Sequence, residues 1–462
     1  MNITSLAFFF LFLPLSLITY WKILKNSRSR LWALLAFSCF FYGLAGWEYI
    51  PLLIGLSWLT YQTARKGWFI PGVLVNLTAL VFFKFIGFDI ALLEWLGLKE
   101  WRILSAWVFP LGLSYYTFKH IGYLLDVSRN RIPATSDFIA FATFSAFFPQ
   151  ISAGPLSSFQ DTGTQLQTLP DQISSGQVFD AIVFITIGLA KKLLIANVLL
   201  GTLQSGVLSL QNPDSGFISA WLVAIASAMG LYFDFSGYTD IVLGIGALFG
   251  VRLPANFNNP FLAKNIQEFW KRWHISLSNW FRVYLFFPLT RWLLVRLGEN
   301  RKAMAQSLAN LITMFMVGLW HGITFGNLAW GVLMGLLLNL HAGRKRRSKL
   351  IKLELLATGG FLFAIMISLA IFSSPNYESV QLLVTKLFGL GGLESVSYLA
   401  EIGINRFVAV LLLSLTIAFS GYAEADKLLH VRKWWFAVLI GMLLWISLLF
   451  MGTPVDFIYV QF

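Results

Sequence analysis

Long apolar runs recur along this chain from end to end, and short polar segments separate them. Many runs reach about 17 to 25 residues, the length that an α-helix needs to cross a bilayer. Runs of this kind are Leu6–Tyr20, Leu31–Trp47, Tyr49–Tyr61, Phe69–Phe88, Phe179–Leu200, Phe217–Phe233, Tyr238–Phe249, Met304–Trp320, Ile323–His341, Leu353–Phe372, Phe407–Phe419 and Trp434–Phe450. The pattern predicts an all-α, polytopic membrane protein with roughly ten to twelve transmembrane helices.

Two further apolar runs, Val108–Val127 and Phe138–Leu156, are interrupted by glycine and proline. Such breaks favour bent or re-entrant helices that are buried within protein rather than exposed to lipid. The polar segment Ser157–Gln177 is predicted to be a surface loop. Because no polar segment is long enough to form a separate domain, residues 1–462 are predicted to form one membrane domain, with residues 434–462 as its last transmembrane helix and C-terminal tail.

Composition and charge agree with a membrane location. Hydrophobic residues make up 57% of the 462 residues and charged residues 12%, with a mean hydropathy of +0.72, whereas about 25% of residues are charged in soluble domains. The net charge of +13 comes from short basic clusters between apolar runs, which is typical of cytoplasmic loops and argues against nucleic-acid binding. By the same rule the N-terminus lies outside and the cluster Arg344–Lys349 lies in the cytoplasm.

The N-terminal region carries two negative findings. The first apolar run lacks the basic residues before it and the cleavage pattern after it that mark a signal peptide, so it is predicted to be a retained helix. The lone cysteine, Cys39, lies inside an apolar run and excludes an intramolecular disulfide.

His321 is the first candidate for a catalytic residue. It lies between Met304–Trp320 and Ile323–His341, two apolar runs whose outer ends adjoin basic residues. Because those ends are predicted to be cytoplasmic, His321 lies at the far end of a helical hairpin or part-way across the membrane. Ionisable groups in a membrane interior usually have a function, and an imidazole suits general acid–base catalysis.

His274 is the second candidate. From Glu268 to Pro288, aromatic and apolar residues recur at three- and four-residue intervals, with charged residues opposite. This spacing predicts an amphipathic helix that lies in the membrane interface or dips into the protein. His274 falls on its aromatic face, either as a hydrogen-bonded core histidine or as a site residue. Residues 256–322 therefore form the predicted active-site core.

Other polar residues near this core are more typical of structure. Asp234 and Asp240 lie in apolar surroundings on either side of Gly237, where a helix break is expected. One of these carboxylates could cap a broken helix end or orient a histidine. Three asparagines precede a proline and are typical of turns and helix caps: Asn256, Asn258 and Asn259.

Several signatures of other chemistry are absent from the sequence. There is no nucleophile elbow, phosphate-binding loop, zinc-binding H-E-x-x-H helix or dinucleotide fingerprint. ATP-driven transport and metalloprotease chemistry therefore lose support, and neither a metal nor a tightly bound cofactor is predicted. Histidines in a membrane interior, without a built-in nucleophile, fit direct transfer between two bound substrates.

A set of segments spans nearly the whole chain and carries a family resemblance: Phe109–Phe118, Phe148–Pro155, Tyr232–Asp240, Asn256–Phe261, Glu268–Leu277, Leu319–Gly322 and Phe457–Phe462. In these segments the chain resembles the membrane-bound O-acyltransferase (MBOAT) family, in its branch of alginate O-acetyltransferase-like proteins. Family members usually carry Arg-Asp-Tyr after the second-histidine helix, where this chain has Arg282, Val283 and Tyr284. That departure concerns the acceptor or the partner protein rather than the fold or the reaction type.

The resemblance implies that His321 is the essential family histidine and His274 the second conserved one. It implies an enzyme of the bacterial inner membrane that takes an acyl group, in particular acetyl, from a cytoplasmic thioester such as acetyl-CoA and delivers it for O-acetylation of an extracytoplasmic polysaccharide. His321 would be the general base, while His274 or a nearby polar group stabilises charge. Four residues are assigned to substrate binding: Trp320, Trp273, Asn258 and Asp240.

Three alternatives remain open on sequence grounds. The branch is similar to the D-alanyl transferase of teichoic-acid modification, so D-alanyl or another acyl group could be moved to a cell-envelope polymer. The same polar residues could serve a transporter or flippase, or the chain could anchor a secretion complex. Because the polar loops are short, polymer recognition is expected to come from a separate extracytoplasmic acetyltransferase partner.

Overall fold

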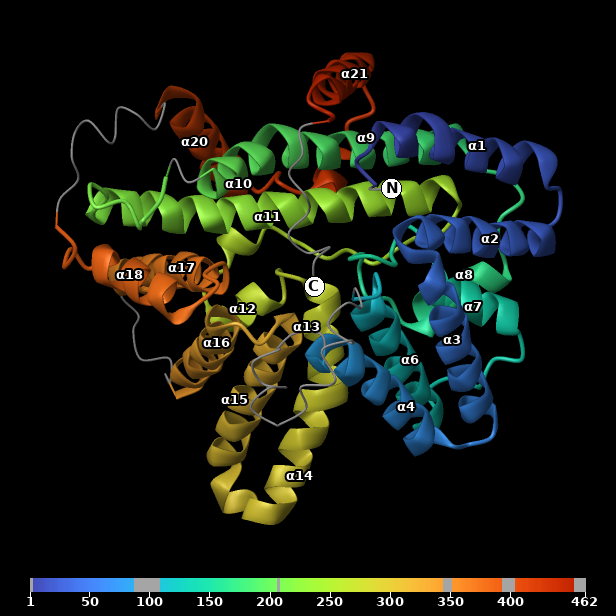
Figure 1. The fold of residues 1–462 in the computed structure, drawn as a ribbon, viewed down its shortest axis with the longest axis horizontal. Coiled ribbons are helices and arrows are strands. Elements are labelled where there is room, and N and C mark those ends of the chain that lie inside the picture. The colour runs from blue at the N-terminus through green and yellow to red at the C-terminus, as the bar shows by residue number, and fades with distance from the viewer. Residues whose placement is uncertain (1–2, 87–108, 206–207, 344–350, 393–403, 453–462) are drawn as a thin grey trace. The chain divides into compact units, whose positions relative to one another are not determined.

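Helices supply all the regular secondary structure in the residues that the computed structural model describes, which are 3–86, 109–205, 208–343, 351–392 and 404–452 (Figure 1). Within these residues, four stretches are long and apolar enough to cross a membrane: Ser27–Arg65, Ser175–Gln204, Phe217–Leu248 and Glu299–His321. The shorter apolar helices are Phe8–Ile23, Phe69–Lys84, Phe325–His341, Ala357–Phe372, Arg406–Ser420 and Trp434–Leu449. The prediction of an all-α membrane protein is confirmed.

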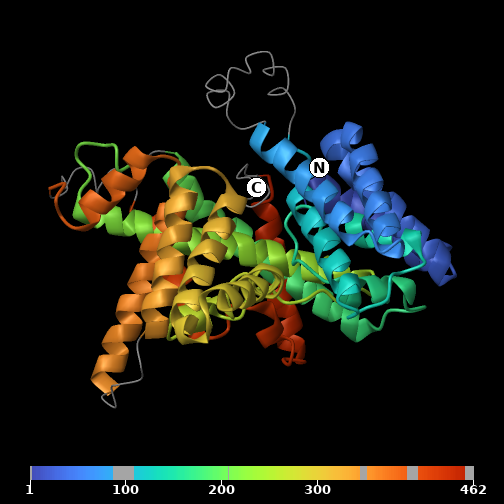
Figure 2. The same ribbon diagram turned by 90° about the horizontal axis from the view of Figure 1, so that it is seen from below.

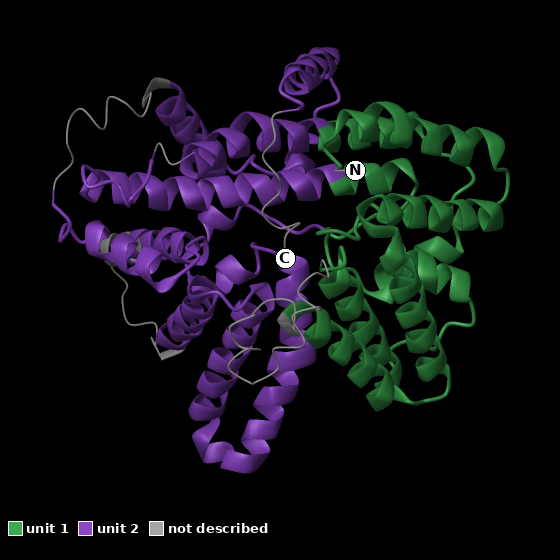
Figure 3. Ribbon diagram, viewed as in Figure 1, with its two compact units in different colours: residues 1–185, 242–254 green, residues 186–241, 255–462 purple. Residues whose placement is uncertain are grey.

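Two segments singled out in the sequence lie outside the described residues, namely the basic cluster Arg344–Lys349 and the C-terminal Phe457–Phe462. The described chain divides into two compact units (Figure 3). Unit 1 comprises residues 1–185 and 242–254, and unit 2 comprises residues 186–241 and 255–462. The single membrane domain stays a prediction.

Unit 1 contains the N-terminal helices. Its elements are η1 (Phe8–Phe12), α1 (Leu13–Ile18), η2 (Thr19–Ile23), α2 (Ser27–Gly46), η3 (Trp47–Tyr49), α3 (Ile50–Arg65), α4 (Phe69–Val81), η4 (Phe82–Ile86), α6 (Leu113–Ser128), α7 (Phe138–Ala146), η6 (Phe159–Gly163), α8 (Thr164–Gln167) and most of α9 (Ser175–Ala190). The helices α2, α3, α4, α6 and α7 pack side by side (Figure 2). Aromatic rings fill the core, where Phe148 lies 5.3 Å from Phe12 and 5.9 Å from Phe41, centroid to centroid.

The Gly- and Pro-interrupted runs of unit 1 form helices that end in turns. α6 begins directly after Gly112, whose φ of 69° lies in the left-handed region. A Cβ at Gly112 would lie 1.9 Å from the carbonyl oxygen of Ile151, so only glycine fits. α7 ends at Ala146, and turns follow it. The predicted loop Ser157–Gln177 contains η6, the short α8 and the start of α9.

Unit 2 contains both candidate histidines. Its elements are η7 (Lys191–Ala196), α10 (Asn197–Gln204), most of α11 (Phe217–Leu248), η8 (Pro260–Leu262), α12 (Ile266–Trp270), α13 (Ile275–Phe281), η9 (Arg282–Phe286), α14 (Phe287–Leu297), η10 (Glu299–Arg301), α15 (Lys302–His321), α16 (Phe325–Gly343), α17 (Ile351–Phe372), α18 (Tyr377–Leu387), α20 (Ile404–Ser420), η11 (Ala425–Leu428) and α21 (Trp434–Leu449). α14 and α15 form an antiparallel hairpin that turns at η10, and α16 packs on α15 (Figure 1).

The structure corrects two helix boundaries expected in this region. The helix break at Gly237 is wrong, because α11 is continuous from Phe217 to Leu248. Gly237 instead allows close packing, since a Cβ there would lie 2.8 Å from the carbonyl oxygen of Gly188. The single amphipathic helix from Glu268 to Pro288 is also wrong, because the chain leaves the helix between α12 and α13, where His274 lies.

Candidate active site

His274 occupies the tight junction between α12 and α13. Its φ of 42° and ψ of 52° lie in the left-handed region, which residues other than glycine rarely adopt. An earlier stretch of chain runs beside this junction: the amide of Asn258 donates to the carbonyl oxygen of Arg272 at 3.0 Å, and the amide of Ile275 donates to the carbonyl oxygen of Asn256 at 2.9 Å. These two hydrogen bonds hold the backbone on both sides of the strained residue.

The side chain of Asn256 sets the tautomer of His274. Asn256 Oδ1 lies 3.1 Å from His274 Nδ1, and it also accepts hydrogen bonds from the amide and the hydroxyl of Ser276 at 3.2 and 2.8 Å. A backbone amide can only donate, so the atom that it meets must be the oxygen of Asn256. An amide oxygen can only accept, so Nδ1 of His274 carries the proton and Nε2 is the basic nitrogen.

The surroundings of His274 are aromatic. The imidazole is 1% exposed, and the ring of Phe235 meets it edge-on at a centroid distance of 4.6 Å. The neighbouring Trp273 is buried in the same way and stacks on Phe269 at 5.5 Å. His274 lies outside the membrane-spanning helices, and burial lowers its pKa from 6.5 to about 3. The imidazole is therefore neutral at physiological pH.

His321 is the last residue of α15 and lies in an aromatic cage. Its ring centroid is 4.6 Å from that of Trp320, 5.6 Å from Trp330 and 4.9 Å from Phe372. The helix ends here because Gly322 has a φ of 155°, which permits the chain to turn sharply into α16. Only 4% of His321 is exposed, so a reaction at this ring would be shielded from bulk water.

A cavity of about 260 Å³ lies within unit 2, between α13 and α15. Four of the residues that line it are exposed and polar, and they mark its mouth: Gln267, Lys271, Asn279 and Arg282. The buried lining is mainly apolar and includes Leu277, Phe281, Met314 and Val317. The cavity therefore combines a cationic, amide-rich mouth with an apolar interior, as small-molecule sites commonly do.

Both histidines lie at the ends of helix faces that line this cavity. Thr313 and Val317 line it, and His321 follows them on α15 at the same four-residue spacing. His274 precedes Leu277 and Ser278, which line the opposite side from α13. Because α14 and α15 are antiparallel, the start of α13 and the end of α15 lie on the same side, away from η10 (Figure 1).

An aromatic bridge joins the cavity to His321. Trp270 lines the cavity, its ring lies 5.9 Å from that of Trp330, and Trp330 lies 5.6 Å from His321. The indole nitrogens of Trp270 and Trp330 are buried and make no hydrogen bond with any residue that the structure describes. Buried N–H groups without an acceptor are rare in folded proteins, so these two are available to a bound molecule.

The four residues predicted to bind substrate lie elsewhere. Trp320 contacts His321, and Trp273 packs beneath the junction that holds His274. Asn258 supports that junction through its backbone, and Asp240 is buried in an ion pair with Lys191. None of the four is among the residues that line the cavity. Their assignment to substrate binding stays a prediction.

Comparison with known proteins places this arrangement in a family. Residues 74–379, which include both histidines and the whole lining of the cavity, match the membrane-bound O-acyltransferase (MBOAT) family. This chain is a membrane-bound O-acyltransferase. The resemblance found in the sequence is thereby confirmed, and so is the prediction that the protein is an O-acyltransferase enzyme. The acyltransferase is also a multi-pass membrane protein, as the helix lengths require.

Curated relatives cover most of the acyltransferase. A probable alginate O-acetylase of Pseudomonas syringae pv. tomato is 32% identical over 442 residues, which are 92% of this chain and 81% of the relative. A probable alginate O-acetylase of Pseudomonas putida is 38% identical over 357 residues, 73% of this chain and 70% of the relative. A peptidoglycan O-acetyltransferase of Helicobacter pylori is 32% identical over 433 residues, 83% of this chain and 79% of the relative.

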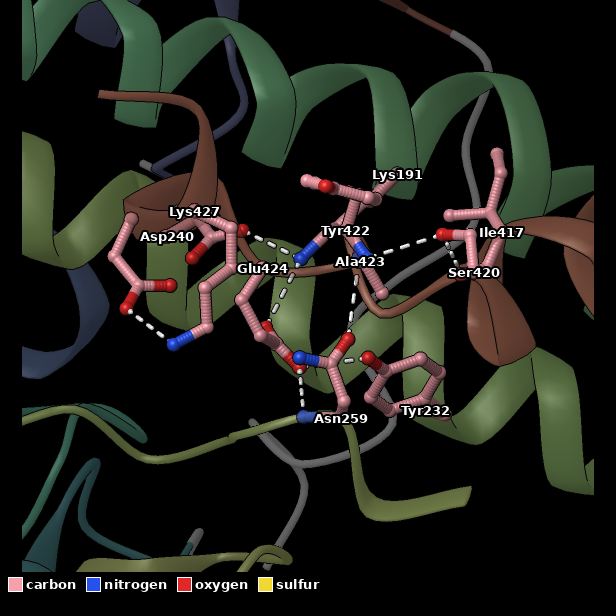
Figure 4. A network of polar contacts seen from close by, with 11 residues as sticks. Lys191, Tyr232, Asp240, Asn259, Ile417, Ser420, Tyr422, Ala423, Glu424 and Lys427 are labelled. Carbon is pink, nitrogen blue, oxygen red and sulfur yellow. Dashed lines mark hydrogen bonds and ion pairs between the residues drawn. The ribbon is translucent and has the colours of Figure 1, made fainter. Parts of the chain in front are cut away.

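Sequence reasoning missed a buried ion-pair network in the acyltransferase. Lys191 Nζ lies 2.6 Å from Asp240 Oδ2 and 3.3 Å from Glu424 Oε2, and Lys192 Nζ lies 2.5 Å from Asp234 Oδ1 (Figure 4 shows the first group). A signal was present, because two adjacent lysines interrupt the apolar run Phe179–Leu200 and a charge in such a run needs a partner. Glu424 gave no comparable signal in the sequence.

Proposed function

We propose that this O-acyltransferase takes an acetyl group from a cytoplasmic thioester, such as acetyl-CoA, and delivers it across the bacterial inner membrane for O-acetylation of an extracytoplasmic polysaccharide. The observation that carries the proposal is the cavity whose lining faces lead to His321 and His274. The relatives support the acyl group and the acceptor class, since those compared act as O-acetylases or O-acetyltransferases by name.

The cavity suits the charge of a CoA-type donor and the size of a short acyl group. Lys271 and Arg282 at the mouth suit the phosphates of a CoA-type donor, because cationic side chains bind phosphate through charge-assisted hydrogen bonds. The apolar interior suits the thioester arm. A volume of about 260 Å³ is at the small end of ligand cavities, which favours a short acyl group over a long one.

His321 is assigned the role of general base. The acceptor hydroxyl gives its proton to the imidazole while its oxygen attacks the thioester carbonyl carbon, so that a C–O bond forms. The C–S bond then breaks, the proton passes from His321 to the leaving sulfur, and the products are the acetyl ester and the free thiol. No covalent enzyme intermediate is required. The aromatic cage excludes water, which limits hydrolysis of the thioester.

His274 is assigned a different role from the one expected from the sequence. With its Nδ1 proton directed to Asn256, the neutral ring presents a basic nitrogen and can only accept a hydrogen bond. A neutral imidazole of this tautomer cannot donate to an oxyanion. We therefore assign His274 to orienting a hydroxyl or amide of a substrate, and charge stabilisation to a nearby donor such as the indole of Trp270 or Trp330.

The decisive experiment uses the purified full-length protein in vesicles, with radiolabelled acetyl-CoA as donor and a membrane extract from cells that lack the protein as acceptor. His321→Ala is expected to lower acetyl transfer by about 10²–10⁴-fold, the usual effect of removing a general base. His430→Ala is the matched control, because His430 is exposed after η11. Near-normal transfer by a folded His321→Ala variant would contradict the proposal.

The acceptor step is proposed to need a second protein. The polar segments of this chain are short, whereas a polysaccharide needs an extended groove of aromatic and polar groups. We therefore propose an extracytoplasmic acetyltransferase as partner. Vesicles that contain this protein alone, with acetyl-CoA inside and polysaccharide outside, are expected to leave the polymer unacetylated until the partner is added. Efficient acetylation by this protein alone would refute the division of labour.

A further inference from the structure

Glu424 lies at the centre of a buried polar network formed by segments far apart in the sequence (Figure 4). Its carboxylate oxygen Oε1 accepts hydrogen bonds from the hydroxyl of Tyr232 at 2.7 Å and from the backbone amide of Asn259 at 3.2 Å. Its other oxygen, Oε2, pairs with Lys191, which also binds Asp240. Glu424 is 4% exposed, so all of these contacts are made away from water.

The loop after α20 makes two hydrogen bonds with Asn259. The amide of Asn259 donates to Glu424, and the side-chain oxygen of Asn259 accepts from the amide of Ala423 at 3.2 Å. Asn259 has a φ of 46°, a left-handed conformation that costs free energy in a residue other than glycine. Such a conformation persists only where the surroundings over-determine it, and the two contacts from this loop do so.

Asn259 continues directly into the segment that holds His274. The preceding residue, Asn258, pairs with the backbone of Arg272, and Asn256 binds both the amide of Ile275 and the imidazole of His274. Asn256, whose hydrogen bond sets the tautomer of His274, therefore lies only three positions before Asn259, which Glu424 holds. A shift of this extended segment must move the imidazole, because no intervening loop can absorb it.

We propose that Glu424 is a positioning residue for the acyl-transfer reaction: it fixes Asn259 and thereby the segment that orients His274. The inference rests on the proposed role of His274 in that reaction. Glu424 lies beyond residues 74–379, the part of the chain that matches the family, so the family match assigns it nothing. Lys191 pairs with the other carboxylate oxygen and helps to hold Glu424 in place beside Asn259, since a buried carboxylate needs a charged partner.

Glu424→Gln tests the proposal with the least change of shape. The variant loses the charge and places an NH₂ group against Lys191 or the amide of Asn259, where two donors meet. Hydrogen–deuterium exchange is expected to become faster at the amides of Asn258 and Ile275, which bridge the junction in the native protein. This measurement does not depend on activity.

A double-mutant cycle gives the second readout. Glu424→Gln is expected to lower kcat for acetyl transfer by about 10–100-fold, because a small misplacement of a site residue can cost that much, while the KM for acetyl-CoA stays nearly constant. In a His274→Ala or His274→Asn background the same substitution is expected to lower kcat by less than about twofold, because the side chain that Glu424 positions is already absent. Asn259→Gly, which tolerates a positive φ but loses the contact with Ala423, is expected to show the same coupling.

Matched controls separate positioning from a general loss of stability. Asp234→Asn breaks the ion pair with Lys192, which is buried as deeply and joins η7 to α11 as Lys191–Asp240 does. Its effect on rate is expected to be equal with and without His274. Lys427→Ala removes a half-exposed ion pair from the same loop and is expected to leave both readouts unchanged.

The outcomes distinguish this inference from the proposed function. Two results would overturn the positioning role even if His321→Ala is inactive. One is that the amides of Asn258 and Ile275 exchange at their native rates in folded Glu424→Gln. The other is that the loss of kcat in Glu424→Gln multiplies with the loss in His274→Ala. Full activity of His274→Ala would overturn it as well. Full activity of His321→Ala would instead refute the acyl-transfer mechanism. Faster exchange together with a coupled loss of kcat would support the positioning role.

Discussion

Buried histidines occur in both units of this protein, and their surroundings differ. In unit 1, His120 is 0% exposed, its Nδ1 lies 2.9 Å from Asn76 Oδ1, and its Nε2 lies 2.8 Å from Ser145 Oγ. In unit 2, His321 lies among aromatic rings at the end of a helix face that lines a cavity. None of the residues around His120 lines that cavity.

The hydrogen bonds of His120 resemble those of a catalytic triad, yet they fit a structural role better. Asn76 uses its amide nitrogen on Thr60 and Gly72, so its oxygen faces Nδ1 of His120, and the hydroxyl oxygen of Ser145 lies 2.8 Å from Nε2. Both ring nitrogens are thus occupied by side chains of the protein's own core. The comparison teaches that burial and good hydrogen bonds do not by themselves identify a catalytic histidine.

The sharpest test of this comparison is the exchange of each histidine for alanine. His321→Ala is expected to lower acetyl transfer by about 10²–10⁴-fold with little change in the melting temperature, because a general base contributes to the reaction more than to packing. Transfer rates and thermal unfolding are measured on the same detergent-purified sample. A large loss of melting temperature in this variant would break the distinction between the two histidines.

His120→Ala is expected to do the opposite. It removes the partner of Asn76 Oδ1 and leaves Ser145 Oγ with only the carbonyl oxygen of Phe141, and each buried polar atom left unsatisfied costs about 1–3 kcal/mol. The free energy of unfolding should therefore fall, while the protein that remains folded keeps its rate of acetyl transfer. A loss of rate per folded molecule comparable to that of His321→Ala would show that His120 belongs to the active site.

A smaller effect is expected at the mouth of the cavity. Lys271→Ala and Arg282→Ala should each raise the KM for acetyl-CoA by about two- to fivefold, since an exposed ion pair contributes about 0.2–1 kcal/mol. The effect should shrink in high salt, which screens exposed charges. Arg291→Ala is the control, because Arg291 is exposed on α14 and is not among the lining residues. Equal KM values for all three variants would place the donor elsewhere.

The effect that is smallest at neutral pH is a pH dependence of stability due to His274. Its pKa is about 3 in the folded state and 6.5 ordinarily, so the unfolded state binds the proton first as the pH falls. The stability contributed by the neutral form is present above about pH 6.5 and is lost towards pH 3, with a slope of up to about 1.4 kcal/mol per pH unit. His274→Asn should unfold with a weaker acid dependence than the wild type. Parallel pH curves would exclude a neutral, buried His274.

The local sequence pattern predicted the elements better than their junctions. Residue spacing over Glu268–Pro288 suggested a continuous helix, yet the hydrogen bonds from Asn256 and Asn258 favour the turn at His274. At Gly237 the reverse happened: a helix break was expected, but the helix is continuous. The absence of a Cβ at Gly237 allows close contact with Gly188 instead. In both cases a partner distant in the sequence decided between conformations that are similar in local propensity.

The sequence by itself determined that this protein is helical and membrane-spanning, that it belongs to the acyltransferase family, and that His321 and His274 are its candidate site residues. The reason is that run length, charge placement and short motifs are local properties of the chain. Only the tertiary structure decided which groups meet: the cavity between α13 and α15, the tautomer of His274, and the contacts of Glu424 with Asn259 and Lys191, 165 and 233 positions away. Those contacts depend on how the helices pack, and no local pattern encodes the partner of a buried charge.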